Sequence, residues 1–240
     1  MKNVTLLALD TATEACSVAL LRGGEKTHLA QFAQREHTKH ILPMVDEILV
    51  QAGITLSQVD ALVFGRGPGS FTGVRIGAGI AQGLAFGADL PVIPVSNLAA
   101  MAQAAYAQYQ AENVLTTIDA RMNEVYFAQW QAQKVRSDFG EFLDWQPVIA
   151  EQVCSPSKAI EQVVQQHREN AVLAGTGWAA YPELNDANLG KATEITLPSA
   201  LYMLDLALPK WFAGETISPL EIEPIYLRNE VTWKKLPGRE

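Results

Sequence analysis

The hydrophobic and polar positions follow two different periods along the first third of the chain. Two short apolar runs, Val4–Leu9 and Cys16–Leu21, predict strands, and a third strand is predicted at Thr27–Phe32, with polar turns between them. Apolar residues then recur every three or four positions over Ile41–Ala52, which predicts a helix closed by a glycine. Pro43 is expected close to the start of this helix, where a missing N–H is tolerated.

Strands and helices alternate in the next segment. Further strands are predicted at Val59–Phe64 and Pro91–Val95, and each is followed by a helical pattern. The first of these helices covers residues 71–86, and the second starts after Ser96, a good N-cap residue, and runs through Gln110. The order β-β-β-α-β-α-β-α predicts an α/β fold in which a mixed sheet is covered by helices.

The second half of the chain begins with the same pattern as the first. A strand at Val114–Ile118 stops at Asp119, as the first strand stops at Asp10, and a short polar turn leads to a strand at Glu124–Trp130. The two aspartates are 119 − 10 = 109 residues apart, which indicates a duplication. We therefore predict two domains, residues 1–110 and 111–240. Later elements are expected as a helix from Ser155 to about His167, a strand at Ala171–Ala174, a sharp turn at Gly175–Gly177, a helix at 200–212 that packs back on the first domain, and an extended tail.

Charge and cysteine content narrow the classes of function. The chain has 26 acidic and 18 basic residues, a net charge of −8, so bulk charge does not favour binding to a phosphate backbone. A basic tail is the exception, because cations gathered there can contact an anionic partner. Two distant cysteines exclude a disulfide framework and a zinc ribbon. We read no signal peptide and no membrane span, and we predict a cytoplasmic protein. The tail cations are Arg228, Lys234, Lys235 and Arg239.

A glycine-rich loop after the fourth strand is the main candidate for chemistry. A strand, a glycine-rich turn and a helix place free backbone N–H groups where anions bind, although the segment is neither a P-loop nor a GxGxxG motif. Asp10 and Asp119 either hold a magnesium-linked phosphate in one cleft or accept N–H bonds from their own turns. The candidate phosphate loops contain Asp10, Thr11, Thr13, Gly67, Gly69 and Asp119.

Two small-residue faces run along the helix that follows this loop. Gly73, Gly77 and Ala81 form one face, and Gly79 and Gly83 begin the other. An interior glycine is about 1 kcal/mol less favourable than alanine, so close packing must compensate, in the core or at an interface with another chain.

His37 and His40 have one spacing that places two metal ligands on a helix face. Without a third ligand the preferred interpretation is a solvated helix start.

Three segments carry a family resemblance that covers nearly the whole chain. They read LDTATEACSVAL at Leu9–Leu20, GPGSFTGVRIG at Gly67–Gly77 and DARMNEVY at Asp119–Tyr126. Together they closely resemble the TsaB family, also called YeaZ, of bacterial tRNA threonylcarbamoyladenosine biosynthesis proteins. The resemblance implies the duplicated two-domain fold of the actin, hexokinase and Hsp70 ATPases, with mixed sheets flanked by helices.

The resemblance also implies a role without catalysis. Proteins of this family are partners of TsaD, the paralogue that transfers threonylcarbamoyl to adenosine 37 of tRNAs reading ANN codons, and the ATPase TsaE joins them. A homodimer is expected when the chain is alone, and any contact with tRNA is expected to be indirect or weak. No cofactor is expected to bind tightly, beyond weak or interfacial ATP or ADP with magnesium. By this analogy the interface lies on the first two helices and contains Ile41, Leu42, Val45, Ile48, Leu49, Phe71, Val74, Arg75, Gly77, Ala78 and Ala81. A bulky residue at Gly77 or Ala81 should then block pairing and leave the fold intact.

One departure from the catalytic paralogue supports this assignment. TsaD-like proteins carry a metal-binding HxxxH pair just after the strand that corresponds to Pro91–Val95, whereas this chain has no histidine or carboxylate over Ser96–Ala102. The resemblance therefore implies no catalytic residue and no metal site. The alternative is an ATP-dependent small-molecule kinase of the same fold.

Overall fold

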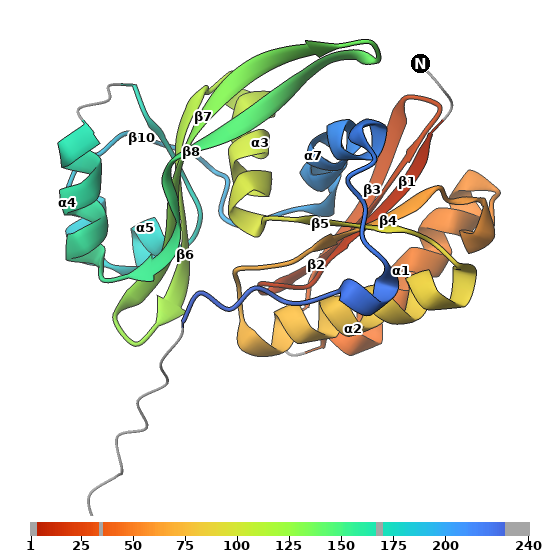
Figure 1. Ribbon diagram of the computed structural model, residues 1–240. Helices are drawn as coiled ribbons and strands as arrows, with labels where there is room; N and C mark the ends of the chain where they lie inside the picture. Colours follow the sequence, from red (N-terminus) through yellow and green to blue (C-terminus); the bar gives the residue numbers. More distant parts are fainter. Residues whose placement is uncertain (1–3, 34–35, 167–169, 229–240) are drawn as a thin grey trace, which may run out of the picture.

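The computed structural model describes residues 4–33, 36–166 and 170–228, which form two five-stranded sheets flanked by helices (Figure 1). The first sheet has the order β3-β2-β1-β4-β5. The β1–β2 and β2–β3 pairs are antiparallel, while β1–β4 and β4–β5 are parallel. Its strands are β1 (Thr5–Asp10), β2 (Ala15–Arg22), β3 (Glu25–Phe32), β4 (Ala61–Gly65) and β5 (Val92–Val95).

The second sheet repeats this topology. Its order is β10-β9-β6-β7-β8, so β6 takes the central place that β1 has in the first sheet. The strand directions match as well, with β6–β7 and β7–β8 antiparallel and β6–β9 and β9–β10 parallel. The duplication predicted from the two aspartates is therefore confirmed at the level of topology. These strands are β6 (Asn113–Arg121), β7 (Glu124–Ser137), β8 (Gly140–Cys154), β9 (Val172–Ala174) and β10 (Lys191–Ala192).

Helices cover both faces of each sheet. On the first sheet α1 (His37–Ala52) and α2 (Phe71–Ala88) share one apolar cluster, and α7 (Ala200–Ala213) packs on the opposite face. On the second sheet α3 (Asn97–Tyr109) covers the face toward α7, and α4 (Pro156–Gln166) covers the other. The short helices are η1 (Leu56–Gln58), α5 (Gly177–Ala180), α6 (Pro182–Asp186) and η2 (Pro219–Glu221).

The helix ends follow from local chemistry. The Ser96 hydroxyl accepts the Ala99 N–H and caps α3, as predicted, and Gly53 closes α1 with a left-handed φ of 64°. The start of α1 was predicted too late. Because the helix begins at His37, Pro43 lies inside it, beyond the first turn. Four residues of this first turn are polar, which hid the start of the helix from the hydrophobic period.

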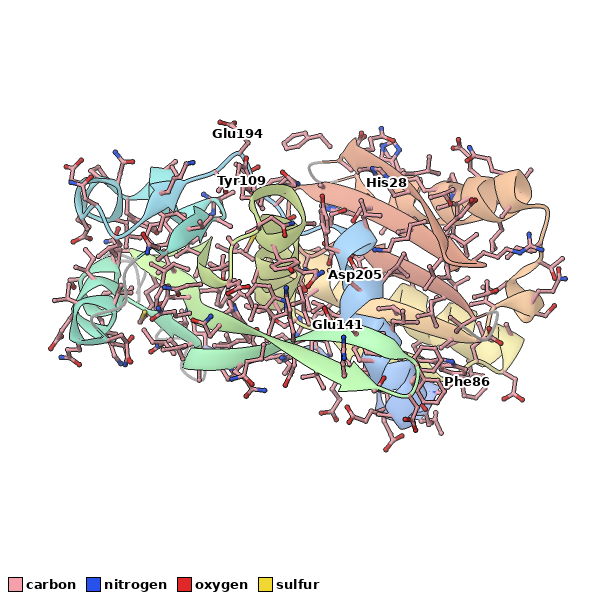
Figure 2. The ribbon with its side chains drawn as sticks, turned by 90° about the horizontal axis from the view of Figure 1, so that it is seen from above. His28, Phe86, Tyr109, Glu141, Glu194 and Asp205 are labelled. Atoms are coloured by element: carbon pink, nitrogen blue, oxygen red, sulfur yellow. The ribbon has the colours of Figure 1, made fainter. Side chains whose placement is uncertain are left out.

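The predicted strand at Glu124–Trp130 is only the first half of the first strand of a long hairpin. It continues as β7 to Ser137 and returns as β8, a strand that the hydrophobic pattern did not predict. The hairpin crosses over α7, with Glu141 near its tip (Figures 1 and 2). Phe139 of the hairpin stacks on Phe212 of α7, with ring centroids 4.4 Å apart.

The C-terminal part of the described chain is extended, as predicted. After η2, residues 222–228 run from the first half of the molecule to the β6–β7 turn, where Arg228 binds Glu124. His167 and the tail cations Lys234, Lys235 and Arg239 lie outside the described residues.

Candidate functional site: the cleft between the two halves

Four loops, two from each half, line a cavity of about 700 Å³. They are the β1–β2 and β6–β7 turns, which correspond to each other, and the loops after β4 and β9, which also correspond. The duplicated topology therefore brings the two glycine-rich loops to one cleft. Predicted residues that line it are Thr13, Gly69 and Asp119.

Asp10 lies at the end of β1, in the interior of the protein and not among the cavity-lining residues. It is 1% exposed, and burial raises the pKa of its carboxyl from 3.8 to about 6. Its Oδ1 accepts bonds from Asn97 Nδ2 at 2.7 Å and from the Ala12 N–H at 3.4 Å, which hold the pKa below the value that burial alone would give. Of the two alternatives for Asp10, a magnesium-linked phosphate or bonds from its own turn, its buried position favours the second.

A short chain of hydrogen bonds explains why this carboxyl is buried. Asn97, the first residue of α3, donates to Asp10 through Nδ2 and accepts the Gly67 N–H through Oδ1 at 2.9 Å. Gly65 is required beside it, because a Cβ there would collide with Asp10 Oδ1. The three segments β1, the glycine-rich loop and α3 are thereby fixed to one another.

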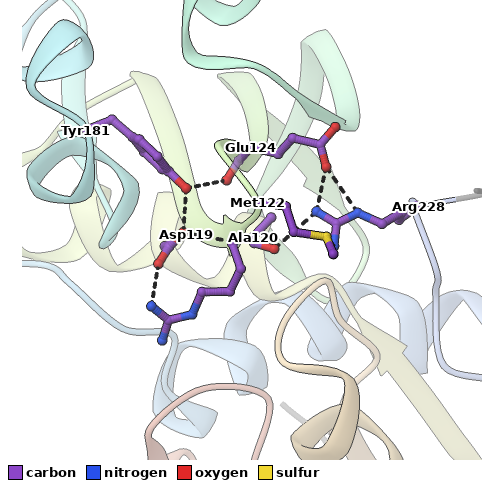
Figure 3. Close-up of polar contacts among 7 residues, drawn as sticks. Asp119, Ala120, Met122, Glu124, Tyr181 and Arg228 are labelled. Atoms are coloured by element: carbon purple, nitrogen blue, oxygen red, sulfur yellow. Dashed lines mark hydrogen bonds and ion pairs between the residues drawn. The ribbon is translucent and has the colours of Figure 1, made fainter. Parts of the chain in front are cut away.

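Asp119 does line the cavity, but its oxygens are already engaged (Figure 3). Oδ1 accepts the Arg121 N–H and the Tyr181 hydroxyl, each at 2.9 Å, and Oδ2 pairs with Arg121 Nη1 at 2.9 Å. Both aspartates therefore accept the N–H of the residue two positions later, Ala12 or Arg121. The geometry favours the turn-forming role over a metal-binding one.

The remaining loop residues mostly serve packing. The Thr11 hydroxyl donates to the Gly73 carbonyl at 2.7 Å, and Gly67 has φ +102°, a conformation that suits glycine. Thr13 is buried, and no hydrogen-bond partner of its hydroxyl lies among the described residues. The sequence suggested a solvated helix start at His37, but the structure buries this side chain. Its Nε2 lies 2.6 Å from the Thr13 carbonyl in a buried contact.

Cations from the second half lie at the cavity wall. Arg121 pairs with Asp119 and reaches to 4.0 Å from Glu14 of the first half. Arg228 donates through Nη2 to Glu124 at 2.5 Å and to the Ala120 carbonyl at 3.1 Å (Figure 3). Asn97 and Tyr181 were not singled out in the sequence, because the aspartates that they bind lie 87 and 62 residues away. Arg121 was not singled out either, although Asp119 is only two residues away on the same turn.

The expected interface on the first two helices needs correction. Ile41, Val45, Ile48, Leu49, Val74, Gly77, Ala78 and Ala81 are all buried within the folded chain. The face of Gly73 and Gly77 packs on the β1–β2 turn, where a Cβ on Gly77 would lie 2.7 Å from Thr11 Oγ1. A bulky residue at Gly77 or Ala81 is therefore expected to disturb the fold itself, contrary to our initial prediction.

A different face of these helices is exposed. Of the predicted interface residues, Leu42 is 47% exposed, Phe71 is 60% exposed and Arg75 is also at the surface. Gly79 and Gly83 continue this face of α2, and nothing lies within 4 Å of a Cβ added at either position. The backbone of another chain can therefore come close to α2 along this second glycine face.

Comparison with known proteins identifies the family. A sequence model described as TsaD, tRNA N6-adenosine threonylcarbamoyltransferase, matches residues 29–212. A Haemophilus influenzae protein named tRNA threonylcarbamoyladenosine biosynthesis protein TsaB is 68% identical over the full length of both chains. The chain belongs to the TsaB family. A TsaB protein of Escherichia coli is 48% identical and covers 98% of this chain and 99% of its own.

Solved structures agree with a TsaB fold. A Pseudomonas aeruginosa protein described as similar to the peptidase YeaZ is 41% identical, has a TM-score of 0.81, and covers 94% of this chain and 100% of its own. YeaZ from the same organism has a TM-score of 0.78 at 39% identity, over 93% of this chain and 100% of its own. The described part of this TsaB-family chain contains no helix long and apolar enough to cross a membrane.

Proposed function

We propose that this chain is a non-catalytic subunit required for threonylcarbamoylation of adenosine 37 in tRNAs that read ANN codons. It acts by binding and activating the catalytic paralogue TsaD together with TsaE, in the cytoplasm. The family membership supports the pathway. The observation that carries the non-catalytic role is the start of α3, where the family resemblance implies a metal pair in the paralogue.

At the start of α3 this chain has residues with structural roles instead. Ser96 caps the helix, Asn97 holds Asp10, and Leu98 and Met101 are fully buried in the core of the second half. These side chains offer no carboxylate or imidazole to a metal or to a substrate. The buried, uncharged helix start supports a scaffold better than a transferase.

We propose that TsaD binds the exposed face of α1 and α2. It combines exposed apolar side chains, such as Phe71 and Leu42, with the open glycine positions 79 and 83. Apolar patches of this kind that can be approached closely are typical of protein interfaces. The same face would form the homodimer when TsaD is absent. A nucleotide with magnesium, if it binds, is proposed to bind weakly in the cleft or at the interface.

The kinase alternative has less support from the geometry. A kinase of this fold needs a carboxylate that is free to orient magnesium or to act as a base in the cleft. Asp10 is buried against Asn97, and Asp119 is engaged by Arg121 and Tyr181. Neither carboxylate is available in this conformation.

The proposed function is tested by reconstituting the modification from purified components. Labelled threonine is followed into tRNA with TsaC, TsaD and TsaE, with or without this chain. We expect label only when this chain and TsaD are both present. Modification at the full rate without this chain would refute the proposed role.

A further inference from the structure

A second cavity, separate from the cleft, lies under the long hairpin. It encloses about 750 Å³ between the β7–β8 hairpin, the start of α3 and the last turns of α7, and shares no lining residue with the cleft cavity. This volume lies within the range of roughly 300–1,000 Å³ that small-molecule sites occupy. The hairpin and α7 that enclose it cross in Figure 2.

Aromatic side chains form one part of the wall of this cavity. Trp130 and Trp145 contribute from the sheet, and Phe142 and Phe212 from the hairpin and α7. Both indole N–H groups are already used, by Thr116 Oγ1 at 3.0 Å and by Gln103 Oε1 at 2.8 Å. The indole rings therefore offer apolar surface to the cavity and no free donor. Flat apolar ligands pack well against such walls.

Two cations, Arg66 and Lys210, and three carboxylates, Asp138, Asp144 and Glu215, line the cavity. Arg66 Nη2 pairs with Glu151 Oε2 at 2.6 Å, and the Ser96 hydroxyl donates to the other oxygen of Glu151. This carboxylate is therefore already engaged. Lys210 also lines the cavity, and its Nζ donates to the Pro94 carbonyl at 3.2 Å.

Lys210 is a cation without an ion pair. Within the described ranges, no ion pair joins a carboxylate oxygen to its ammonium within 4.0 Å, although Glu215 lines the same cavity and Glu151 is paired with Arg66. The side chain is half-buried, and burial lowers the pKa of its amine; Arg66 acts in the same direction, while Glu215 and Glu151 act in the opposite one. A partly buried ammonium with one neutral hydrogen-bond partner gains from an anion that enters the cavity.

We propose that the cavity under the hairpin binds a small organic monoanion with a flat apolar body. The anionic group contacts the Lys210 ammonium, and the apolar body lies among Trp130, Trp145 and Phe142. Both halves of the molecule contribute to this site, since Lys210 belongs to the helix on the first sheet and the tryptophans belong to the second.

The proposal is tested with two fluorescent probes of similar shape on the full chain. One is 8-anilinonaphthalene-1-sulfonate, an aromatic monoanion, and the other is N-phenyl-1-naphthylamine, its uncharged analogue. We expect saturable binding of the anion with one site per chain. Lys210→Met should weaken binding of the anion about tenfold, because a charge-assisted hydrogen bond is lost. Binding of the neutral probe should not change, because the aliphatic stem is kept.

Two further variants make the outcome specific. Lys210→Arg keeps the charge and should retain the affinity for the anion. Lys158→Met removes an exposed lysine on α4 and should have no effect on either probe. Equal affinity of the wild-type chain and Lys210→Met for the anion would overturn the proposal, as would equal weakening of both probes or binding that does not saturate.

Discussion

The buried carboxyl of Asp10 makes a quantitative prediction about stability. In the folded chain burial raises its pKa from 3.8 to about 6, a shift of about 2 pKa units. Each unit corresponds to about 1.4 kcal/mol, so the full linkage is about 3 kcal/mol. The side chain is 1% exposed, so no discount for solvent screening applies.

The sign follows from which state binds the proton more tightly. Between pH 3.8 and 6 the unfolded chain has lost the proton of Asp10 while the folded chain still holds it. The contribution of this group to folding stability is therefore complete below pH 3.8 and is lost as the pH rises through 6. Other carboxylates titrate in the same range, so the contribution of Asp10 must be isolated by difference.

The variant Asp10→Asn isolates the contribution of the Asp10 carboxyl, because an amide of the same shape does not titrate. The asparagine oxygen can still accept the bonds from Asn97 and Ala12. Urea unfolding of both chains gives the stability difference at each pH. The free energy of unfolding of the variant minus that of the wild type should increase by about 2 kcal/mol as the pH is raised from 4.5 to 7.5. The difference at any single pH also contains a constant term, because the new NH₂ replaces an oxygen that has no partner among the described residues.

The control is Asp46→Asn, which changes an exposed carboxylate on α1. It should leave the pH dependence of stability as in the wild type. A stability difference between Asp10→Asn and the wild type that does not change with pH would refute the account of Asp10 as a buried group with a raised pKa.

Two further predictions concern packing and a partly buried ion pair. Gly77→Ala should lower stability by about 1–3 kcal/mol, because the new Cβ meets Thr11 Oγ1 at 2.7 Å, while Gly79→Ala should raise it by about 0.5–1 kcal/mol in open space. Urea unfolding compares them at a protein concentration at which light scattering shows a monomer, because the Gly79 face is also the proposed homodimer face. Equal effects would contradict the assignment of the two faces. Arg66→Met should lower stability by about 3 kcal/mol, because it leaves Glu151 without its cation, and Glu151→Gln in the same chain should recover part of the loss. A double-mutant cycle in which the two losses simply add would argue against the pair.

Local signals in the sequence were enough for most elements and for the duplication. Ser96 begins α3 through its side chain, and Gly53 ends α1 through its left-handed backbone, so both roles are visible without tertiary contacts. The repeat of Asp10 and Asp119 is also local, since each side chain accepts an N–H two residues later. The strand β8 was missed because it mixes charged, aromatic and proline residues with no regular alternation.

The assignments that failed depend on long-range contacts. Gly77 and Gly79 look equivalent in the sequence, and only the position of the β1–β2 turn makes one buried and the other open. Asp10 and Asn97 are 87 residues apart, so their hydrogen bond could not be inferred from spacing. His37 lies in a polar segment and is buried only because its ring meets the Thr13 carbonyl.

The most direct test of the central claim is the affinity of this chain for TsaD, measured for two single variants by titration calorimetry. Gly79→Gln places a long side chain on the open glycine face of α2 and favours the helix, so the fold is kept. Val164→Gln changes an exposed residue of α4 in the other half. We predict that Gly79→Gln weakens binding at least tenfold and that Val164→Gln leaves it unchanged. Equal affinity of the two variants would contradict the proposal that this chain acts by binding TsaD through the exposed face of its first two helices.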